Sequence, residues 1–161
     1  MMKEKKKKRL LFVCLGNICR SPLAEALMRQ IQTEYNLDFE LDSAGTSGYH
    51  SGELPDARTR ANALKNGIDI SYLRARQFLP DDLNAFDHIY TMDRNNLLDI
   101  QNANPGSEHL NKLSLLPHPD KKGEFIEIPD PYYGTEADFE HVFQLLNTSV
   151  AVLCKGFNQI D

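Results

Sequence analysis

What this chain can fold into is constrained most by residues 10–22, which read LLFVCLGNICRSP. The first four of these residues are apolar and lead without a polar residue into Cys14, as in a strand buried in a parallel sheet. Between residues 23 and 35 apolar side chains recur at helical spacing, and Ser21 and Pro22 suit the cap and the first turn of a helix. The pattern therefore predicts a strand, a short loop and a helix, with a thiol at the carboxyl end of the strand.

The loop between this strand and this helix, residues 15–19, is predicted to bind phosphate. At a helix amino terminus the N–H groups of a loop converge on one point, and the helix dipole favours negative charge there. Gly16 and Asn17 tolerate the positive φ angles that a tight cradle needs. Arg20 adds a planar guanidinium that can bind two phosphate oxygens at once.

The same positive field would stabilise a thiolate at Cys14. A free cysteine is mostly protonated at neutral pH, whereas cysteines at a helix amino terminus beside arginine ionise at much lower pH. A thiolate next to a bound tetrahedral oxyanion predicts phosphoryl transfer through a cysteinyl-phosphate. The alternative is a buried cysteine that closes a strand, with Arg20 in a surface ion pair. That alternative suits an isolated cysteine better than this ordered combination of residues.

Strands and helices alternate along the rest of the chain. Such alternation produces a parallel sheet with helices on both faces, and its ligands bind beyond the carboxyl ends of the strands. We therefore predict an α/β fold, a single-domain three-layer sandwich with a doubly wound, four-stranded parallel sheet flanked by helices. Further strands are expected at residues 39–43, 87–91 and 113–116, and further helices after Asp56, after Asp93 and from Thr135, with a helical turn at Pro80 and a long loop over 118–131.

The composition indicates one globular domain. The chain has 161 residues, of which 41% are hydrophobic and 25% charged. Its net charge of -5 argues against nucleic acid as a partner. Residues 1–9 are lysine-rich and are predicted to form a basic, disordered tail before a domain over residues 10–161. The apolar run after the tail is too short for a signal peptide, so we expect a cytoplasmic protein with no membrane partner.

Three stretches of the chain resemble low-molecular-weight protein tyrosine phosphatases. Residues 13–22 are similar to the phosphate-binding loop of that family, which has the pattern C-x5-R-S near the amino terminus. Residues 42–48, DSAGTSG, and residues 130–134, DPYYG, match as well. The resemblance extends from Arg9 to about Phe157 and implies hydrolysis of phosphotyrosine and aryl phosphates, on a sheet of strand order 2-1-3-4.

The resemblance also implies roles for three catalytic residues. Cys14 matches the nucleophile, Arg20 the group that binds the phosphate, and Asp130 the general acid that then acts as base. The flanking Pro129 and Pro131 support the choice of Asp130, because they restrict the backbone of a loop that must present an acid accurately. From the residues alone, Asp42, Asp56 and Asp93 remain alternative acids.

Other residues of the matching stretches correspond to the support of the phosphate loop. In the family a serine at the position of Ser21 hydrogen-bonds the thiolate, and an asparagine at the position of Asn17 is held in a left-handed conformation. This sequence departs from the family at Tyr72, where the family usually has a histidine of the same network. The predicted loop and support residues are Leu15, Gly16, Asn17, Ile18, Cys19, Ser21 and Ser43.

The predicted walls of the substrate pocket are apolar and aromatic. Leu15, Tyr49 and Tyr132 match pocket residues of the family, and Tyr133 follows directly. Such walls favour a flat phenyl ring on a long stem over phosphoserine. A branch of the family that acts on phosphoarginine carries threonine where this chain has Ile18, which favours phosphotyrosine here.

The remaining thiols allow two interpretations. Cys19 either captures an oxidised Cys14 as a disulfide or simply fills space beside the loop, and Cys154 is expected in the core. An arsenate reductase of the same fold needs a relay of further thiols, and there is none between Cys19 and Cys154. A non-catalytic phosphate-binding or redox-switch module would use the loop but would have no role for Asp130.

No cofactor or metal is predicted. The 5 histidines show no metal-ligand spacing, and the 3 cysteines form no C-x2-C pair. The expected partners are phosphotyrosine-containing proteins and, in the active site, phosphate or similar oxyanions. We expect a monomer or a weak dimer.

Overall fold

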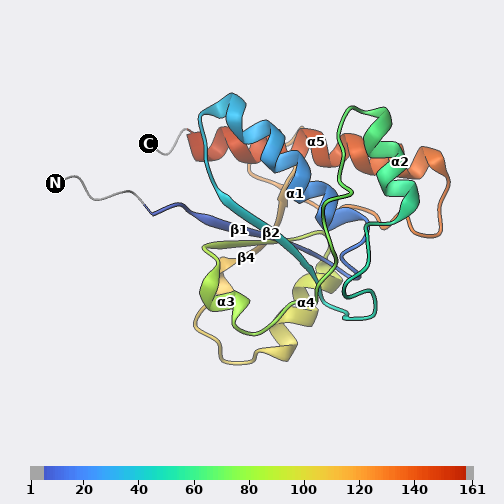
Figure 1. Cartoon of the computed structure of the whole chain (residues 1–161). Helices are drawn as coiled ribbons and strands as arrows, with labels where there is room; N and C mark the ends of the chain where they lie inside the picture. The colour runs from blue at the N-terminus through green and yellow to red at the C-terminus, as the bar shows by residue number, and fades with distance from the viewer. Residues whose placement is uncertain (1–5, 159–161) are drawn as a thin grey trace.

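The computed structural model describes residues 6–158, and a twisted sheet forms its centre (Figure 1). Within these residues the sheet has five strands in the order β2-β1-β3-β4-β5. The first four are parallel, which confirms the predicted order 2-1-3-4, and β5 pairs antiparallel with β4. The strands are β1 (Arg9–Cys14), β2 (Glu40–Gly45), β3 (His88–Thr91), β4 (Leu113–Pro117) and β5 (Phe125–Ile126).

The predicted count of four strands is one too low, because the sheet also contains the short strand β5. Residues 118–131 were expected to form only a loop, but Phe125 and Ile126 turn back and pair with Pro117 and Leu116. Two residues are too few for a strand to be recognised from alternation of apolar and polar side chains. The pairing anchors the loop that continues to Asp130.

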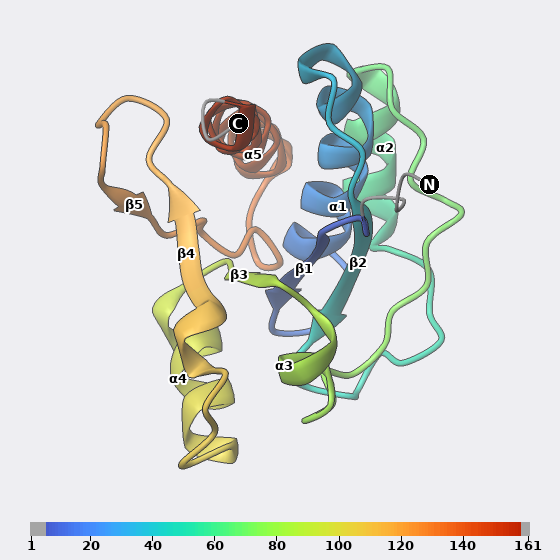
Figure 2. The same cartoon turned by 90° about the vertical axis from the view of Figure 1, so that its left-hand side faces the viewer.

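Helices cover both faces of the sheet (Figure 2). Helices α1, α2 and α5 lie on one side, and α3 and α4 lie on the other. The helices are α1 (Arg20–Ile31), α2 (Ala57–Lys65), α3 (Asp82–Ala85), α4 (Arg94–Ala103) and α5 (Glu136–Asn158), with 3-10 turns η1 (Gln32–Tyr35) and η2 (Leu110–Lys112). The predicted three-layer α/β sandwich is therefore confirmed.

From Leu10 to Cys14 the central strand β1 is apolar, because both of its faces are buried there. Leu10 and Phe12 point into the core under α1 and α5, whereas Leu11 and Val13 belong to a second core against α3 and α4. All four side chains are fully buried. Since side chains alternate along a strand, Cys14 falls on the α1 face at the end of β1.

Several residues near the site lie at the starts of helices. Asp56 caps α2 by accepting from Arg58 N, and Asp93 caps α4 in a reciprocal pair with Asn96. The expectation that Ser21 caps α1 is wrong. Cys19 occupies the cap position without a side-chain cap bond, and Ser21 lies within the first turn, where its hydroxyl serves the active site instead.

The lysine-rich tail is ordered at its end. Of the predicted tail, residues 1–5 lie outside the described residues. Lys7 pairs with Asp38 at 3.0 Å, and β1 begins at Arg9, whose side chain pairs with Glu40 at 2.9 Å. No helix within residues 6–158 is long and apolar enough to cross a membrane.

Candidate active site

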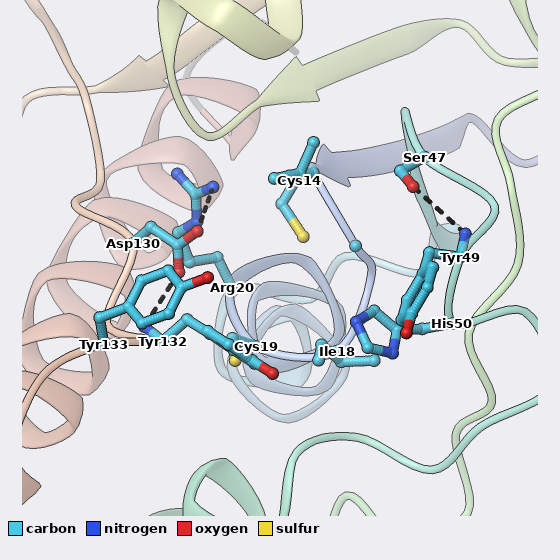
Figure 3. A pocket seen from close by; sticks show the side chains of 12 residues that line it. Cys14, Ile18, Cys19, Arg20, Ser47, Tyr49, His50, Asp130, Tyr132 and Tyr133 are labelled. Carbon is cyan, nitrogen blue, oxygen red and sulfur yellow. Dashed lines mark hydrogen bonds and ion pairs between the residues drawn. The ribbon is translucent and has the colours of Figure 1, made fainter.

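A pocket of about 320 Å³ lies beyond the carboxyl end of β1, at the edge of the sheet where the sequence placed it. In Figure 3 the Cys14 sulfur lies at its centre, with Arg20 and Asp130 on one side and Tyr49 and His50 on the other. It is lined by Cys14, Leu15, Gly16, Ile18, Cys19, Arg20, Ser47, Tyr49, His50, Asp130, Tyr132 and Tyr133. The structure thus brings most of the predicted site residues together around one thiol.

The Cys14 sulfur is surrounded by hydrogen-bond donors. Asn17 N–H donates to Cys14 Sγ at 3.3 Å, and the Ser21 hydroxyl lies 3.0 Å from the same sulfur. Asn17 Nδ2 donates to Ser21 Oγ at 2.8 Å, so the Ser21 hydrogen can point at the sulfur or at the more distant Ala44 O, 3.4 Å away. These donors stabilise an anionic sulfur, so the geometry favours a thiolate.

The loop owes its shape to Asn17. Asn17 has a φ of 56°, the left-handed conformation expected for it, while Gly16 does not use a positive φ. Gly16 instead allows His50 to pack closely, because a Cβ at residue 16 would lie 3.1 Å from His50 Cδ2. Of the two loop residues that tolerate positive φ, only Asn17 therefore adopts it.

Gly45 at the end of β2 lets the phosphate loop lie against the sheet. A Cβ built on Gly45 would lie 2.8 Å from Leu15 O and 2.9 Å from the carbonyl carbon of Gly16, closer than atoms can approach. We expect Gly45→Ala to displace the loop and to lower kcat/KM for an aryl phosphate by about a hundredfold. Gly156→Ala is the control, because residue 156 has open space around it. Wild-type kcat/KM in Gly45→Ala would contradict this account.

A chain of hydrogen bonds extends from the sulfur to a buried carboxylate. Asn17 Nδ2 donates to Ser43 Oγ at 3.0 Å, and the Ser43 hydroxyl donates to Glu25 Oε1 at 2.8 Å. Glu25 Oε2 accepts from Arg29 at 2.6 Å. Burial raises the pKa of Glu25, although the hydrogen bonds from Arg29 and Ser43 act in the opposite direction. The Asn17 amide therefore donates to two hydroxyls, each of which faces an anionic group.

These hydrogen bonds hold Asn17 in place in a protein that has Tyr72 where the family usually has a histidine. Asn17 Oδ1 accepts from Arg76 N at 2.9 Å, so both ends of its amide are fixed. Tyr72 is half exposed. The buried carboxylate of Glu25, which is paired with the more exposed Arg29, supports Ser43 by accepting from its hydroxyl.

Arg20 is held in place by three segments of the chain. It is almost fully buried at the start of α1, and its Nη1 donates to Asp93 Oδ2 at 2.6 Å and to Ile128 O at 2.9 Å. Burial lowers the pKa of Arg20, but the Cys14 sulfur and the carboxylates of Asp93 and Asp130 outweigh it and raise the pKa overall. The guanidinium is thus a permanent positive charge beside the thiol.

Asp130 reaches the pocket from the loop that follows β5. Its Oδ2 lies 3.6 Å from Arg20 Nη2, and its Oδ1 accepts from Tyr132 N at 3.1 Å. Its side chain is 43% exposed, so it can exchange protons with solvent, whereas Asp93 is engaged by Arg20. Asp42 pairs with Arg76 and Asp56 with Arg58, away from the Cys14 sulfur. Of the carboxylates considered, the geometry favours Asp130 as the acid.

Aromatic side chains surround the pocket mouth. Tyr132 is 37% exposed, while Tyr49 and Tyr133 are 86% and 97% exposed. The rings of Tyr132 and Tyr133 meet edge to face with centroids 4.9 Å apart, and Tyr49 meets His50 in the same way at 4.8 Å. Two aromatic walls therefore face each other across the entrance, as Figure 3 shows.

Cys19 and Cys154 are buried and free. Burial raises the pKa of Cys19 to about 12 and that of Cys154 to about 11, so both remain protonated at neutral pH. A protonated thiol is slow to attack an oxidised sulfur. The predicted disulfide between Cys19 and an oxidised Cys14 would therefore form slowly. Cys154 contacts Met28 Sδ at 3.3 Å in the core, as expected.

The raised pKa values of Cys19 and Cys154, together with the hydrogen-bond donors around the Cys14 sulfur, predict selective alkylation. At pH 7, iodoacetamide should label the folded protein at Cys14 alone, because only a thiolate reacts quickly. Raising the pH to 9 should still leave Cys19 and Cys154 unlabelled, since both pKa values lie above that pH. Mass spectrometry of peptides measures the labels, and the urea-unfolded protein, in which all three thiols react, is the control. Label on Cys19 at pH 7 would contradict the prediction.

Sequence reasoning missed the roles of four residues of the site. Asp93 was expected as a helix cap and considered as an alternative acid, yet its role is to fix Arg20. Glu25 and Arg29 have the spacing of a surface ion pair on a helix, so nothing in the sequence marks Glu25 as buried. His50 follows the predicted pocket residue Tyr49, but its packing against Gly16 depends on the folded chain. Glu25 could be recognised as a buried carboxylate only if the position of Ser43 on β2 relative to α1 were known.

Within the described part of the chain no group of three or more His, Cys, Asp or Glu residues could hold a metal ion. The chemistry of the pocket instead rests on a thiol, a guanidinium and a carboxyl group around an oxyanion cradle. A strand–loop–helix cradle under a cysteine, on a doubly wound sheet, defines the class of cysteine-dependent phosphatases.

Comparison with known proteins agrees with this class. The model of the family described as low molecular weight phosphotyrosine protein phosphatase matches residues 9–160. The low molecular weight phosphotyrosine protein phosphatase of Homo sapiens is 44% identical over 146 residues, 89% of this chain and 91% of the human protein. The corresponding protein of Gallus gallus is 44% identical over 153 residues, 93% of each chain.

A solved structure agrees as well. The protein tyrosine phosphatase of Entamoeba histolytica, crystallised with Hepes in its active site, superposes with a TM-score of 0.87 at 34% identity. The match covers 95% of this chain and 98% of that one. The chain described here belongs to the low molecular weight phosphotyrosine protein phosphatase family.

Proposed function

We propose that this protein hydrolyses phosphotyrosine and aryl phosphates through a cysteinyl-phosphate intermediate. One observation carries the proposal: two separate segments of the chain bring the Cys14 sulfur, the Arg20 guanidinium and the Asp130 carboxyl group into one pocket. Membership of the family supports the same reaction. The relative from Entamoeba binds Hepes, which carries a sulfonate, in its active site, and a sulfonate resembles phosphate in shape and charge.

The first step transfers the phosphoryl group to sulfur. The Cys14 thiolate attacks phosphorus, an S–P bond forms, and the P–O bond to the phenol breaks. Arg20 and the N–H groups of the loop bind the equatorial oxygens as their charge redistributes. Asp130, protonated in this step, gives its proton to the departing oxygen, so that a phenol leaves in place of a phenolate.

The second step releases phosphate. Asp130, now a carboxylate, takes a proton from water as the water oxygen attacks phosphorus, and the S–P bond breaks. The electron pair returns to Cys14, where the Ser21 hydroxyl, 3.0 Å from the sulfur, and Asn17 N–H stabilise it. The enzyme is then ready for another substrate, and no metal or cofactor takes part.

The walls of the pocket support an aromatic substrate. Tyr49 and Tyr132 border the entrance and Leu15 and Ile18 line it, so a phenyl ring can pack between aromatic and apolar groups on its way to the sulfur. A phosphoserine has no ring to fill this space. We therefore propose phosphotyrosine-containing proteins as the substrates.

Two expectations from the sequence remain proposals. A cytoplasmic location suits three free cysteines, one of them the nucleophile, because a reducing compartment keeps thiols reduced. A monomer or weak dimer suits an enzyme whose proposed catalytic groups all come from one chain.

The alternatives explain less of the site. Arsenate reduction would require thiols that relay electrons from the pocket, but the chain has only Cys154 beyond Cys19, and Cys154 is fully buried against Met28. A redox switch without catalysis would use Cys14 and Cys19, but it gives no reason for Asp130 to lie 3.6 Å from Arg20.

The proposal is tested with p-nitrophenyl phosphate in the presence of EDTA. We expect hydrolysis without added metal, a burst of phenol before the steady state, and a bell-shaped dependence of rate on pH, because one group must be ionised and another protonated. A protein that does not release p-nitrophenol under these conditions, but reduces arsenate with thioredoxin, would refute the proposal.

A further inference from the structure

Beside the pocket lies a second depression, between α2 and the start of α5, that the catalytic mechanism does not use. We call it the α2–α5 groove, and it has a volume of about 290 Å³. Ala57, Ala61 and Lys65 line it from α2, and Gly134, Phe139 and Glu140 line it from the other side.

The groove has an apolar floor and small residues along one side. Phe139 is almost fully buried, so its ring forms the floor of the groove and does not project into it. Ala57 and Ala61 are one helical turn apart and exposed, and their short side chains leave the space above the ring open. The space is large enough for a leucine or methionine side chain, with charged groups at its rim.

The groove is separated from the substrate pocket by Arg58, which contacts a residue of each. The Arg58 guanidinium lies over the Tyr132 ring at 5.2 Å and over the Phe139 ring at 4.7 Å, and it donates to Tyr132 O at 2.8 Å. Tyr132 lines the pocket, and Phe139 lines the groove. One arginine therefore forms the partition between the two, and Asp56 holds that arginine in place at 2.9 Å.

The distance across this partition suits a peptide. The two steps from Tyr132 to Arg58 and from Arg58 to Phe139 are each about 5 Å, so the two rings lie within about 10 Å of one another. An extended peptide advances about 3.3 Å per residue, so about three residues cover this distance. A polypeptide whose phosphotyrosine occupies the pocket can thus place a neighbouring side chain in the groove.

We propose that the α2–α5 groove is a substrate subsite that binds one apolar side chain of the phosphoprotein, two to four residues from the phosphotyrosine. The inference rests on the proposed phosphotyrosine phosphatase function and adds a source of selectivity to it. The pocket recognises the phosphorylated ring, and the groove selects among the sequences that carry it. Binding energy at the groove would act on peptide substrates and not on small aryl phosphates.

The test uses phosphotyrosine peptides in which all neighbours are alanine except one leucine, moved from four residues before to four residues after the phosphotyrosine. At one position or two adjacent positions we expect leucine to raise kcat/KM about tenfold, the size of effect that burial of such a side chain gives. Equal kcat/KM for all peptides would overturn the subsite.

Substitutions in the groove locate the effect. Ala61→Glu and Ala61→Leu should each abolish the leucine preference by filling the space above Phe139, with p-nitrophenyl phosphate hydrolysis unchanged. Leu64→Glu is the matched control, because Leu64 is 61% exposed on the same helix and does not line the groove. A leucine preference that persists in both Ala61 variants would place the selectivity elsewhere and refute the proposal.

Two further readouts separate this proposal from others. Failure to hydrolyse p-nitrophenyl phosphate would refute the proposed function, whereas hydrolysis with no peptide preference refutes the groove alone. Sedimentation of the wild type and Ala61→Glu tests whether a second copy of the chain fills the groove. An oligomer that dissociates in the variant would assign the groove to self-association and overturn the subsite.

Discussion

Replacement of Cys14 by serine is expected to abolish turnover of p-nitrophenyl phosphate, with a loss of roughly ten-thousandfold or more in kcat. A serine hydroxyl remains protonated at neutral pH, so no anion faces the phosphorus. The donors around residue 14, Asn17 N–H and the Ser21 hydroxyl, stabilise an anion and cannot take its proton. Neither of these donors then converts the serine into a nucleophile.

The cradle itself should survive the Cys14→Ser substitution. The hydrogen bonds of Asn17 to Ser21, Ser43 and the Arg76 backbone do not involve sulfur, and Arg20 remains paired with Asp93. We therefore expect the variant to bind inorganic phosphate within about tenfold of the wild-type affinity, measured by calorimetry. Residual kcat above one hundredth of the wild-type value would exclude Cys14 as the nucleophile.

Replacement of Asp130 by alanine is expected to lower kcat by about a hundredfold to ten-thousandfold, the usual contribution of a general acid. The loss should be larger for phenyl phosphate than for p-nitrophenyl phosphate, because phenolate is the stronger base and needs its proton more. Asp130→Asn should behave like Asp130→Ala, since an amide keeps the shape of the side chain but donates no proton to a leaving group. Steady-state rates with both substrates provide the measurement.

An aspartate of the preceding loop, between β4 and β5, provides the control. Asp120 is exposed and lies well before the pocket residues, so Asp120→Ala should leave both rates unchanged. An unchanged rate in Asp130→Ala would move the acid role to another carboxyl group. Equal losses for the two substrates would show that Asp130 supports the loop and does not protonate the leaving oxygen.

The parts of this site that could be predicted are those encoded by a few adjacent residues. A buried strand, a loop with Asn17 and a helix beginning near Arg20 follow from local pattern, and together they form the cradle. Alternation of strands and helices gave the parallel sheet, and the sheet determines the edge at which the pocket forms.

What could not be predicted depends on contacts between distant segments. Glu25 lies beneath Ser43 only because α1 packs across β2, and Asp93 reaches Arg20 only because β3 pairs with β1. The wrong prediction that Ser21 caps α1 had a local cause. Helix α1 begins one residue before Ser21, with Cys19 at the cap position, so the hydroxyl is free to face the sulfur.

The restraint of Arg20 by Asp93 and the Ile128 carbonyl has a consequence for affinity. A long flexible side chain loses about 1.5–2 kcal/mol of rotational freedom when it is fixed. Here that loss occurs once, when the protein folds, and does not recur at each encounter with a substrate. Variants that loosen the fold around β3 or the segment after β5 would therefore bind phosphate more weakly without any change to the residues that touch it.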